Sequence, residues 1–113
     1  DNKNLLSIAP EYSDNKSEIY FLPNASWSHR IIGLFANNLA RKNRDKAHAI
    51  LIEMDEGFMV SVRSPYAKPF GADKLCRIFN SGGGRKAAAG INNLTKKNLE
   101  KFIGNFLKHK WQN

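Results

Sequence analysis

The stretch AHAILIEMDEGFMVSVRS, residues 47–64, decides the fold. Its first part, Ala47 to Met54, is apolar at almost every position, which is typical of a strand buried on both faces. The turn residues Asp55-Glu56-Gly57 come next, and Phe58 to Ser64 is predicted as the returning strand of a hairpin. The segment therefore predicts an antiparallel pair of strands.

Alternation along the returning strand separates an apolar face from a polar one. Successive side chains of a strand point to opposite sides of the sheet. Phe58 and Val62 therefore share one face, whereas Ser61 and Arg63 project together from the other. Ser64 lies beside them at the strand end, so this polar face is a candidate binding surface.

A strand and a helix are predicted before the hairpin. Glu18 to Leu22 is interpreted as a strand that stops at Pro23-Asn24. Ser26 or Ser28 can cap a helix that runs to about Lys42. Its apolar residues have helical spacing: Ile32, Phe35, Ala36 and Leu39. The basic residues at its C-terminal end suit the helix dipole: Arg41, Lys42 and Arg44.

Two helices and a strand are predicted after the hairpin. A loop at Pro65 to Gly71 leads to a short helix at Ala72 to Asn80. The small residues Ala87 to Ile91 are interpreted as a strand, although helix propensity argues the opposite for three alanines. Thr95 is expected to cap the last helix, whose apolar side carries Leu99, Phe102, Ile103, Phe106 and Leu107, with Trp111 beyond.

This order of elements predicts an α/β (α+β) fold. A strand–helix–strand unit requires a parallel pair, and the hairpin requires an antiparallel one. We therefore expect a mixed parallel/antiparallel β-sheet of about four to five strands, covered by about three helices.

Composition bounds the kind of protein. The chain has 113 residues, enough for one domain with its own core, and 42% of them are hydrophobic. The single cysteine excludes a disulfide-stapled secreted mini-protein. With no signal segment and no apolar run long enough for a membrane helix, we expect a cytoplasmic protein with no membrane partner. A net charge of +8 favours polyanionic partners.

The chain begins at Asp1 rather than Met, so we expect it to be a piece of something longer. Residues 1–17 are polar apart from an apolar patch at Leu5, Leu6 and Ile8, and are interpreted as a linker. Residues 18–113 are interpreted as the folded domain.

A run of glycines is the sharpest chemical feature. Ser81 is followed by Gly82, Gly83 and Gly84, and then at once by Arg85 and Lys86. Three successive glycines cost backbone entropy, and their exposed N–H groups can form a nest for an anion. Arginine can grip a phosphate through two parallel hydrogen bonds. A plain flexible turn is the alternative.

Other chemistries are not supported by the sequence. The P-loop and the Rossmann glycine pattern are both absent. The histidines at 29, 48 and 109 are not at metal-ligand spacing, so no metal site and no catalytic residue is predicted in this chain. Cys76 is interpreted as a small apolar residue of a helix face, and His48 as a core histidine.

Three stretches resemble one family. SGGGRKAAAG, residues 81–90, resembles the Gly-Gly-Gly-His-x-x-Ala-Ala-Gly signature of the DHH-associated (DHHA) domain, the C-terminal half of DHH phosphoesterases. SVRS at 61–64 resembles the family's Ser-x-Arg-Ser strand, and WSHRIIGLFA at 27–36 resembles a helix start of RecJ-type exonucleases and oligoribonuclease relatives. Together they cover roughly residues 18–108.

The resemblance implies a division of labour. An N-terminal DHH domain, missing here and expected in cis, would hold two divalent metal ions, usually manganese. The DHHA domain would hold the substrate's phosphate or terminal nucleotide. The positions that match the family's substrate-binding residues are Arg63, Ser64, Gly82, Gly83, Gly84 and Arg85, and the residue chemistry adds Ser61 and Lys86.

One departure from the signature changes the expected chemistry. Arg85 stands where the family has histidine, and Lys86 replaces a common proline. Arginine stays protonated, so proton transfer at residue 85 is implausible while phosphate binding is kept. The chain by itself is expected to be inactive.

Three functions follow from these observations. The first is a substrate-binding domain of a phosphoesterase that acts on short oligonucleotides, nucleoside bisphosphates or cyclic dinucleotides. The alternative is a stand-alone RNA or single-stranded DNA binding module, favoured by the lysines of the last helix. The third is an interaction domain in which the glycine run is only a turn.

Overall fold

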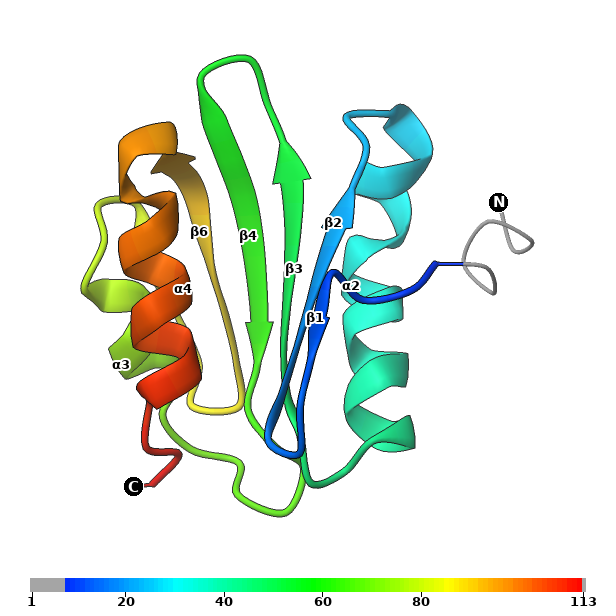
Figure 1. Cartoon of the computed structure of the whole chain (residues 1–113), viewed down its shortest axis with the longest axis vertical. Helices are drawn as coiled ribbons and strands as arrows, with labels where there is room; N and C mark the ends of the chain where they lie inside the picture. The colour runs from blue at the N-terminus through cyan, green and yellow to red at the C-terminus, as the bar shows by residue number, and fades with distance from the viewer. Residues whose placement is uncertain (1–7, 113) are drawn as a thin grey trace.

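The hairpin predicted at residues 47–64 is present and lies at the centre of the sheet. The computed structural model describes residues 8–112. Strand β3 (Ala47–Glu53) pairs antiparallel with β4 (Gly57–Arg63) and parallel with β2 (Ser17–Leu22). Helix α2 (Ser26–Lys42) makes the crossover from β2 to β3. The mixed parallel and antiparallel sheet is thereby confirmed (Figure 1).

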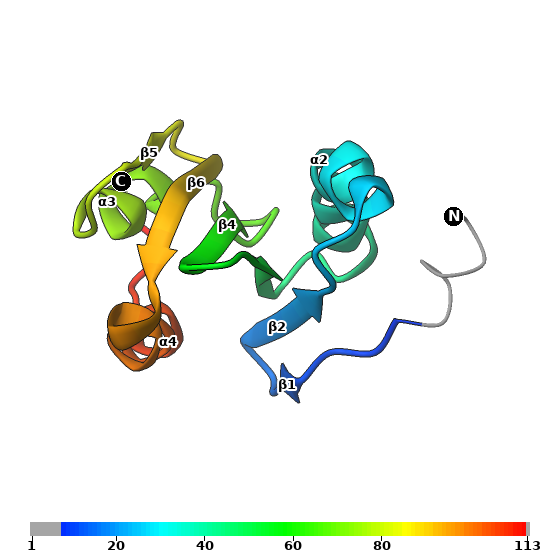
Figure 2. The same ribbon diagram turned by 90° about the horizontal axis from the view of Figure 1, so that it is seen from above.

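The sheet has six strands in the order β1-β2-β3-β4-β6-β5. The remaining elements are β1 (Tyr12–Ser13), α3 (Ala72–Arg77), β5 (Gly82–Gly84), β6 (Ala88–Thr95), a 3-10 turn (Lys96–Asn98) and α4 (Leu99–Lys108). Helix α2 covers one face of the sheet, whereas α3 and α4 cover the other (Figure 2).

Each face of the sheet has its own apolar core. On the side of α3 and α4, the sheet residues Val60, Val62, Ala89 and Ile91 pack with the helix residues Leu75, Phe102 and Phe106, among others. Against α2 pack Tyr20, Leu22, Ile50 and Ile52 with the helix residues Phe35, Ala36 and Leu39. The stripe predicted for α2 and the apolar side predicted for α4 therefore face the sheet as expected.

Several details differ from the sequence prediction. The short strands β1 and β5 raise the count to six, because two- and three-residue segments carry no periodicity to detect. Helix α2 has Ala25 at its N-cap position, which has no side-chain acceptor, so Ser26 and Ser28 lie inside the helix and neither caps it. Thr95 precedes the 3-10 turn and does not cap α4, which begins at Leu99.

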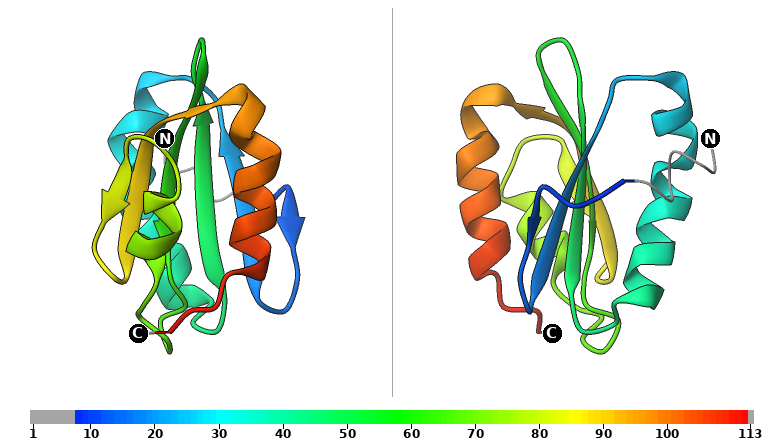
Figure 3. Two further views of the ribbon diagram at one scale, coloured as in Figure 1. Left: turned by 90° about the vertical axis from the view of Figure 1, so that its left-hand side faces the viewer. Right: turned by 45° about the vertical axis from the view of Figure 1, so that its right-hand side comes forward.

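The boundary at residue 17 stays a prediction, although Tyr12–Ser13 pair with β2 as a strand. Leu5 and Leu6 lie outside the described residues, whereas Ile8 packs against the core beneath α2. No helix in the described part of the chain is both long and apolar enough to span a membrane. The β3–β4 turn marks one end of the molecule, and the C-terminal segment lies at the other (Figure 3).

Candidate anion-binding groove

Pairing across the sheet places the candidate residues in rows on the α2 face. Ser61 of β4 is opposite Gly90 of β6, and Gly90 is opposite Gly83 of β5. Arg63 is opposite Ala88 in the next row. Directly paired residues project from the same face of a sheet. At these paired positions beyond β4, therefore, the face carries only the methyl group of Ala88 and the hydrogens of Gly90 and Gly83.

A groove of about 570 Å³ lies where these rows meet α2. We call it the arginine groove and define it by its lining residues: Asn37, Ala40, Arg41, Arg63, Ser64, Tyr66, Pro69, Ala87 and Ala88. These residues come from α2, the end of β4, the loop after it and the start of β6. The end of the polar strand face predicted from the alternation of β4 thus borders a real concavity.

Arg63 is held in a fixed position within the groove. Its Nε donates to Oδ1 of Asn37 at 2.9 Å, and its Nη1 donates to Oγ of Ser61 at 3.0 Å and to the Val62 carbonyl at 3.2 Å. Among the described residues Nη2 has no hydrogen-bond partner, so the held guanidinium can still donate to a ligand.

The electrostatics of the groove favour an anion. Burial lowers the pKa of Arg63, and the charge of nearby Arg85 lowers it further. Arg41 and Arg63 are the positive charges of the lining, Arg85 lies outside it, and no carboxylate is among the lining residues. Two close guanidinium groups repel each other, and a bound anion would relieve that repulsion.

Ser64 and Lys86 have local roles in the structure. Ser64 is buried, and both its amide, at 3.1 Å, and its Oγ, at 3.4 Å, donate to the Ala87 carbonyl. These bonds join the end of β4 to the segment before β6. The Lys86 ammonium lies over the Phe70 ring, 5.9 Å from its centroid. Their roles in substrate binding stay predictions.

The glycine run is an edge strand rather than a loop of bare amides. The amide of Gly82 donates to the Phe79 carbonyl at 3.1 Å, and that of Arg85 to the Ala88 carbonyl at 2.8 Å. The expected nest of successive free N–H groups is therefore wrong. The reason is that the chain reverses between Gly84 and Ala88, which lets residues 82–84 pair with β6.

The three glycines differ in what surrounds them, and only two are required by the structure. A side chain on Gly82 would overlap the Cys76 carbonyl, so the glycine allows close approach of the end of α3. Gly84 has φ of 143°, in the region that favours glycine. Gly83 alone faces open space, on the same side as Ser61. Of the three glycines, Gly83 is thus the one whose open side lies on the α2 face.

The sequence did not indicate three polar residues of the groove, Asn37, Arg41 and Tyr66. Asn37 and Arg41 are four residues apart on α2, beside its apolar stripe, and the arginine was assigned to the helix dipole. Their spacing puts them on one helix face, which could have indicated a common target. Tyr66 lies in the loop after β4, where no pattern pointed to it.

The remaining candidates are structural. Cys76 is fully buried, and burial together with the nearby Asp73 charge raises the pKa of its thiol to about 12, so it packs as predicted. His48 is also fully buried, with its Nε2 3.4 Å from Oε1 of Glu18 and no satisfied hydrogen bond. Within residues 8–112 no group of histidine, cysteine and acidic side chains could hold a metal ion.

Comparison with known proteins adds one finding about the fold. No family model matches this chain, and no curated protein does. Solved structures do match, among them the crystal structure of an exopolyphosphatase-related protein from Bacteroides fragilis, which is 24% identical over 94% of this chain with a TM-score of 0.60. This chain spans 32% of that protein's length. The likeness shows that the two share a fold.

Proposed function

We propose that this chain is the substrate-binding, DHHA-type domain of a DHH-family phosphoesterase, and that the arginine groove holds a phosphate of the substrate. The observation that carries the proposal is Arg63, which Asn37 and Ser61 hold in a groove lined without a carboxylate. The charge of Arg85 reaches Arg63, although Arg85 is not among the lining residues. A positioned guanidinium with free donors matches the geometry of a phosphate oxygen pair.

The three resembling stretches support this proposal because the fold brings their chemistry together. Arg63 comes from the Ser-x-Arg-Ser stretch, and Arg85 and the glycines come from the signature stretch. The helix-start stretch lies on α2, which continues to Asn37 and Arg41 at the groove. A fold shared with an exopolyphosphatase-related protein is consistent with a phosphate ester or anhydride as the ligand.

In this proposal the chemistry belongs to another part of a longer protein. The described residues offer no metal cluster of their own, so divalent metal ions would be held by an N-terminal DHH domain in cis. Here Arg63 and Arg85 would bind and orient the phosphate, and the bare floor at Ala88 and Gly90 would admit the rest of the substrate. Suitable substrates are short oligonucleotides and nucleoside bisphosphates.

Calorimetric titration tests the assignment directly. We expect this chain to bind pyrophosphate, adenosine bisphosphate and a diadenylate, and the Arg63→Ala/Arg85→Ala variant to lose at least about tenfold in affinity. The matched control is Arg30→Ala/Arg77→Ala, which removes the same charge from exposed positions outside the lining of the groove.

Unchanged affinity in the Arg63→Ala/Arg85→Ala protein, or an equal loss in the control, would remove the site assignment. A ligand of many nucleotides that binds far better than the diadenylate, with a steep salt dependence, would instead favour a stand-alone nucleic-acid module. The gene sequence upstream of Asp1 provides a separate check, since the proposal requires an Asp-His-His segment there.

A further inference from the structure

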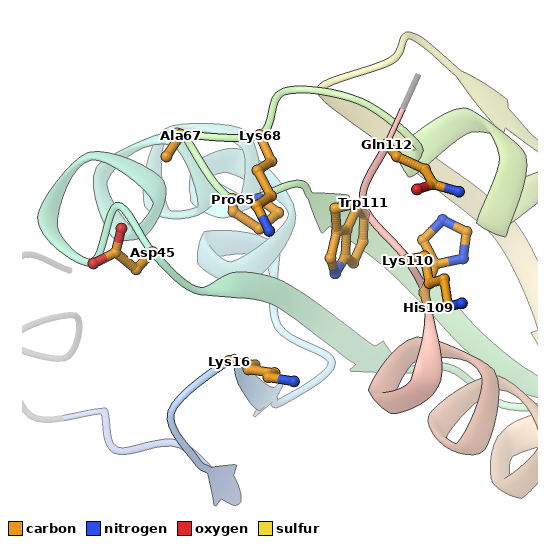
Figure 4. A pocket seen from close by; sticks show the side chains of 9 residues that line it. All are labelled: Lys16, Asp45, Pro65, Ala67, Lys68, His109, Lys110, Trp111 and Gln112. Carbon is orange, nitrogen blue, oxygen red and sulfur yellow. The ribbon is translucent and has the colours of Figure 1, made fainter.

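A second groove opens at the same end of the molecule, on the other side of the loop that follows β4. Its volume is about 460 Å³, and we call it the lysine groove. Its lining residues are Lys16, Asp45, Pro65, Ala67, Lys68, His109, Lys110, Trp111 and Gln112, which come from four separate segments of the chain (Figure 4). Their convergence could not be read from the sequence.

Backbone and side-chain bonds hold these segments in place. The Asp14 carboxylate accepts from the amides of Lys16 and Ser17, both at 2.7 Å, and the Lys16 carbonyl accepts from the amide of Ala47. The amide of Lys68 donates to the Pro65 carbonyl at 2.9 Å. The turn that bears Lys16 and the loop that bears Lys68 are therefore fixed on the domain.

The C-terminal segment is fixed as firmly. Nε2 of His109 donates to the Gly71 carbonyl at 2.8 Å. The indole of Trp111 packs edge-to-face against Phe106 and His109, with ring centroids 6.0 and 4.7 Å apart. Trp111 stays partly exposed at the groove, and Lys110 is thereby held next to it.

The groove has an excess of positive charge. Lys16, Lys68 and Lys110 carry three positive charges against the single negative charge of Asp45. None of these lysines is ion-paired to another residue of the described chain. Figure 4 shows Lys16 and Lys68 extending toward the side of the hollow where Trp111 lies. A small anion between them would gain charge-assisted hydrogen bonds.

The apolar part of the lining indicates what accompanies the anion. Trp111, Pro65 and Ala67 are the aromatic and aliphatic residues of the lining, and the indole of Trp111 offers a flat ring. Aromatic side chains bind nucleobases by stacking, which does not depend strongly on the base. Pockets of this size accept a small organic ligand. The combination suits a ligand that carries both a ring and a phosphate.

We propose that the lysine groove is a second binding site, which takes a nucleotide with its phosphate among Lys16, Lys68 and Lys110 and its base against Trp111. The nucleotide can be a free molecule, or one unit of a strand whose end lies in the arginine groove. A strand could reach both grooves because they share one loop. Ser64, Tyr66 and Pro69 line the arginine groove, and Pro65, Ala67 and Lys68 line the lysine groove.

NMR spectra of the isotope-labelled chain report on the two grooves separately. The chain has two tryptophans: Trp111 lines the lysine groove, whereas Trp27 belongs to α2 and is not among the lining residues. The side-chain Nε–H of Arg63 reports on the arginine groove. The probes are AMP, pyrophosphate and a phosphorylated pentaadenylate.

We expect AMP or the pentaadenylate to shift the Trp111 indole resonance saturably and to leave Trp27 unmoved. Affinity measured at Trp111 should fall at least about tenfold in Lys16→Gln/Lys68→Gln/Lys110→Gln, because the variant removes the positive charge that attracts the phosphate. The matched control, Lys74→Gln/Lys97→Gln/Lys108→Gln, removes the same charge from exposed positions and should leave that affinity within about twofold.

The source of the nucleotide follows from the Arg63→Ala/Arg85→Ala protein. If AMP shifts the Trp111 resonance equally in this variant and in the unmodified chain, the ligand is a free nucleotide. If only the pentaadenylate shifts the resonance, and the variant loses that shift, the ligand is one unit of a strand. No shift at Trp111 with any probe, equal affinity in the two lysine variants, or a response to pyrophosphate as large as that to AMP would each overturn the proposal. If the Arg63 resonance responds to no probe while the Trp111 resonance responds as expected, only the proposed function is contradicted.

Discussion

The two faces of strands β4 and β6 come from alternate residues of the same strands, yet they differ in almost every property. On the side of α3 and α4, Val60, Val62, Ala89 and Ile91 are between 0% and 7% exposed. On the side of α2, their neighbours Ser61, Arg63, Ala88 and Gly90 are all partly exposed. One face is filled by phenylalanines, and the other is left open.

The difference indicates that this small domain uses one face for stability and the other for binding. Helix α2 packs on β3 and β4, and β6 lies beyond the helix (Figure 2). On the α2 face β6 carries the small residues Ala88 and Gly90. The open face therefore contributes little apolar burial and is free to carry charge. Substitutions on the two faces should accordingly affect different measurements.

The largest expected effect is on the filled face. Phe102 is fully buried, stacks on Phe106 with centroids 6.0 Å apart and meets Phe79 at 5.8 Å. Phe102→Ala should lower the free energy of unfolding by about 3–5 kcal/mol, because it removes apolar contacts and leaves a cavity. Urea denaturation followed by circular dichroism measures the change.

Arg63→Ala is the matching change on the open face. It should lower the free energy of unfolding by only about 1 kcal/mol, the net worth of ordinary hydrogen bonds, while it weakens ligand binding. The contrast between the faces would fail if Arg63→Ala destabilised the chain as much as Phe102→Ala, or if the phenylalanine variant lost affinity while it was still folded.

The next largest effect is a pH dependence of stability, and it comes from buried residues on the α2 side of the central strands. The row that contains Arg63 continues through His48 to Glu18, which are directly paired across β4, β3 and β2. Burial lowers the pKa of His48 to about 4, although the Glu18 carboxylate acts in the opposite direction. Burial also disfavours the charged form of Glu18, but hydrogen bonds from Tyr20, Lys46 and Ser13 outweigh it and lower the pKa.

The sign of the pH dependence follows from the lowered pKa of His48. Unfolded histidine takes up its proton near pH 6.5, whereas the folded one resists until about pH 4. The stabilisation is thus present above pH 6.5 and is lost as the pH falls toward 4. We expect the free energy of unfolding to drop on the order of 2–3 kcal/mol over that range from this group.

Denaturation curves at a series of pH values measure this slope. His48→Gln should flatten it between the two pKa values, since the titrating ring is gone. His29→Gln removes a histidine from the start of α2 and serves as the control that should keep the slope. An equal slope in the His48→Gln protein would show that other groups cause the acid sensitivity.

Sequence patterns predicted the parts of this molecule that depend on periodicity. The alternation of β4 identified Ser61 and Arg63 as neighbours, and the helical stripes of α2 and α4 identified the residues that pack on the sheet. The edge strand β5 was missed because its pairing depends on a reversal at residues 85–87 rather than on its own composition. Asn37 and the lysine groove were missed because they join segments that are distant in sequence.

The smallest predicted effects separate two adjacent glycines. Gly82→Ala should lower the free energy of unfolding by about 1–3 kcal/mol, because the new methyl group overlaps the Cys76 carbonyl and the end of α3 must move. Gly83→Ala should change it by no more than about 0.5 kcal/mol, because nothing lies within 4 Å of the added carbon. Thermal and urea denaturation of both variants measure the pair.

A larger residue at the second position extends the same comparison to binding. Gly83→Leu should keep the stability of the Gly83→Ala protein, since its side chain projects from the open face beside Gly90 and Ser61. There it would occupy the floor across which the rest of the substrate is proposed to lie. Calorimetry should therefore show that the affinity for the diadenylate, relative to the unmodified chain, falls more than the affinity for pyrophosphate. If both ligands bind as in the unmodified chain, the open face ends at Arg63, and the glycines of β5 serve only the packing of the sheet edge.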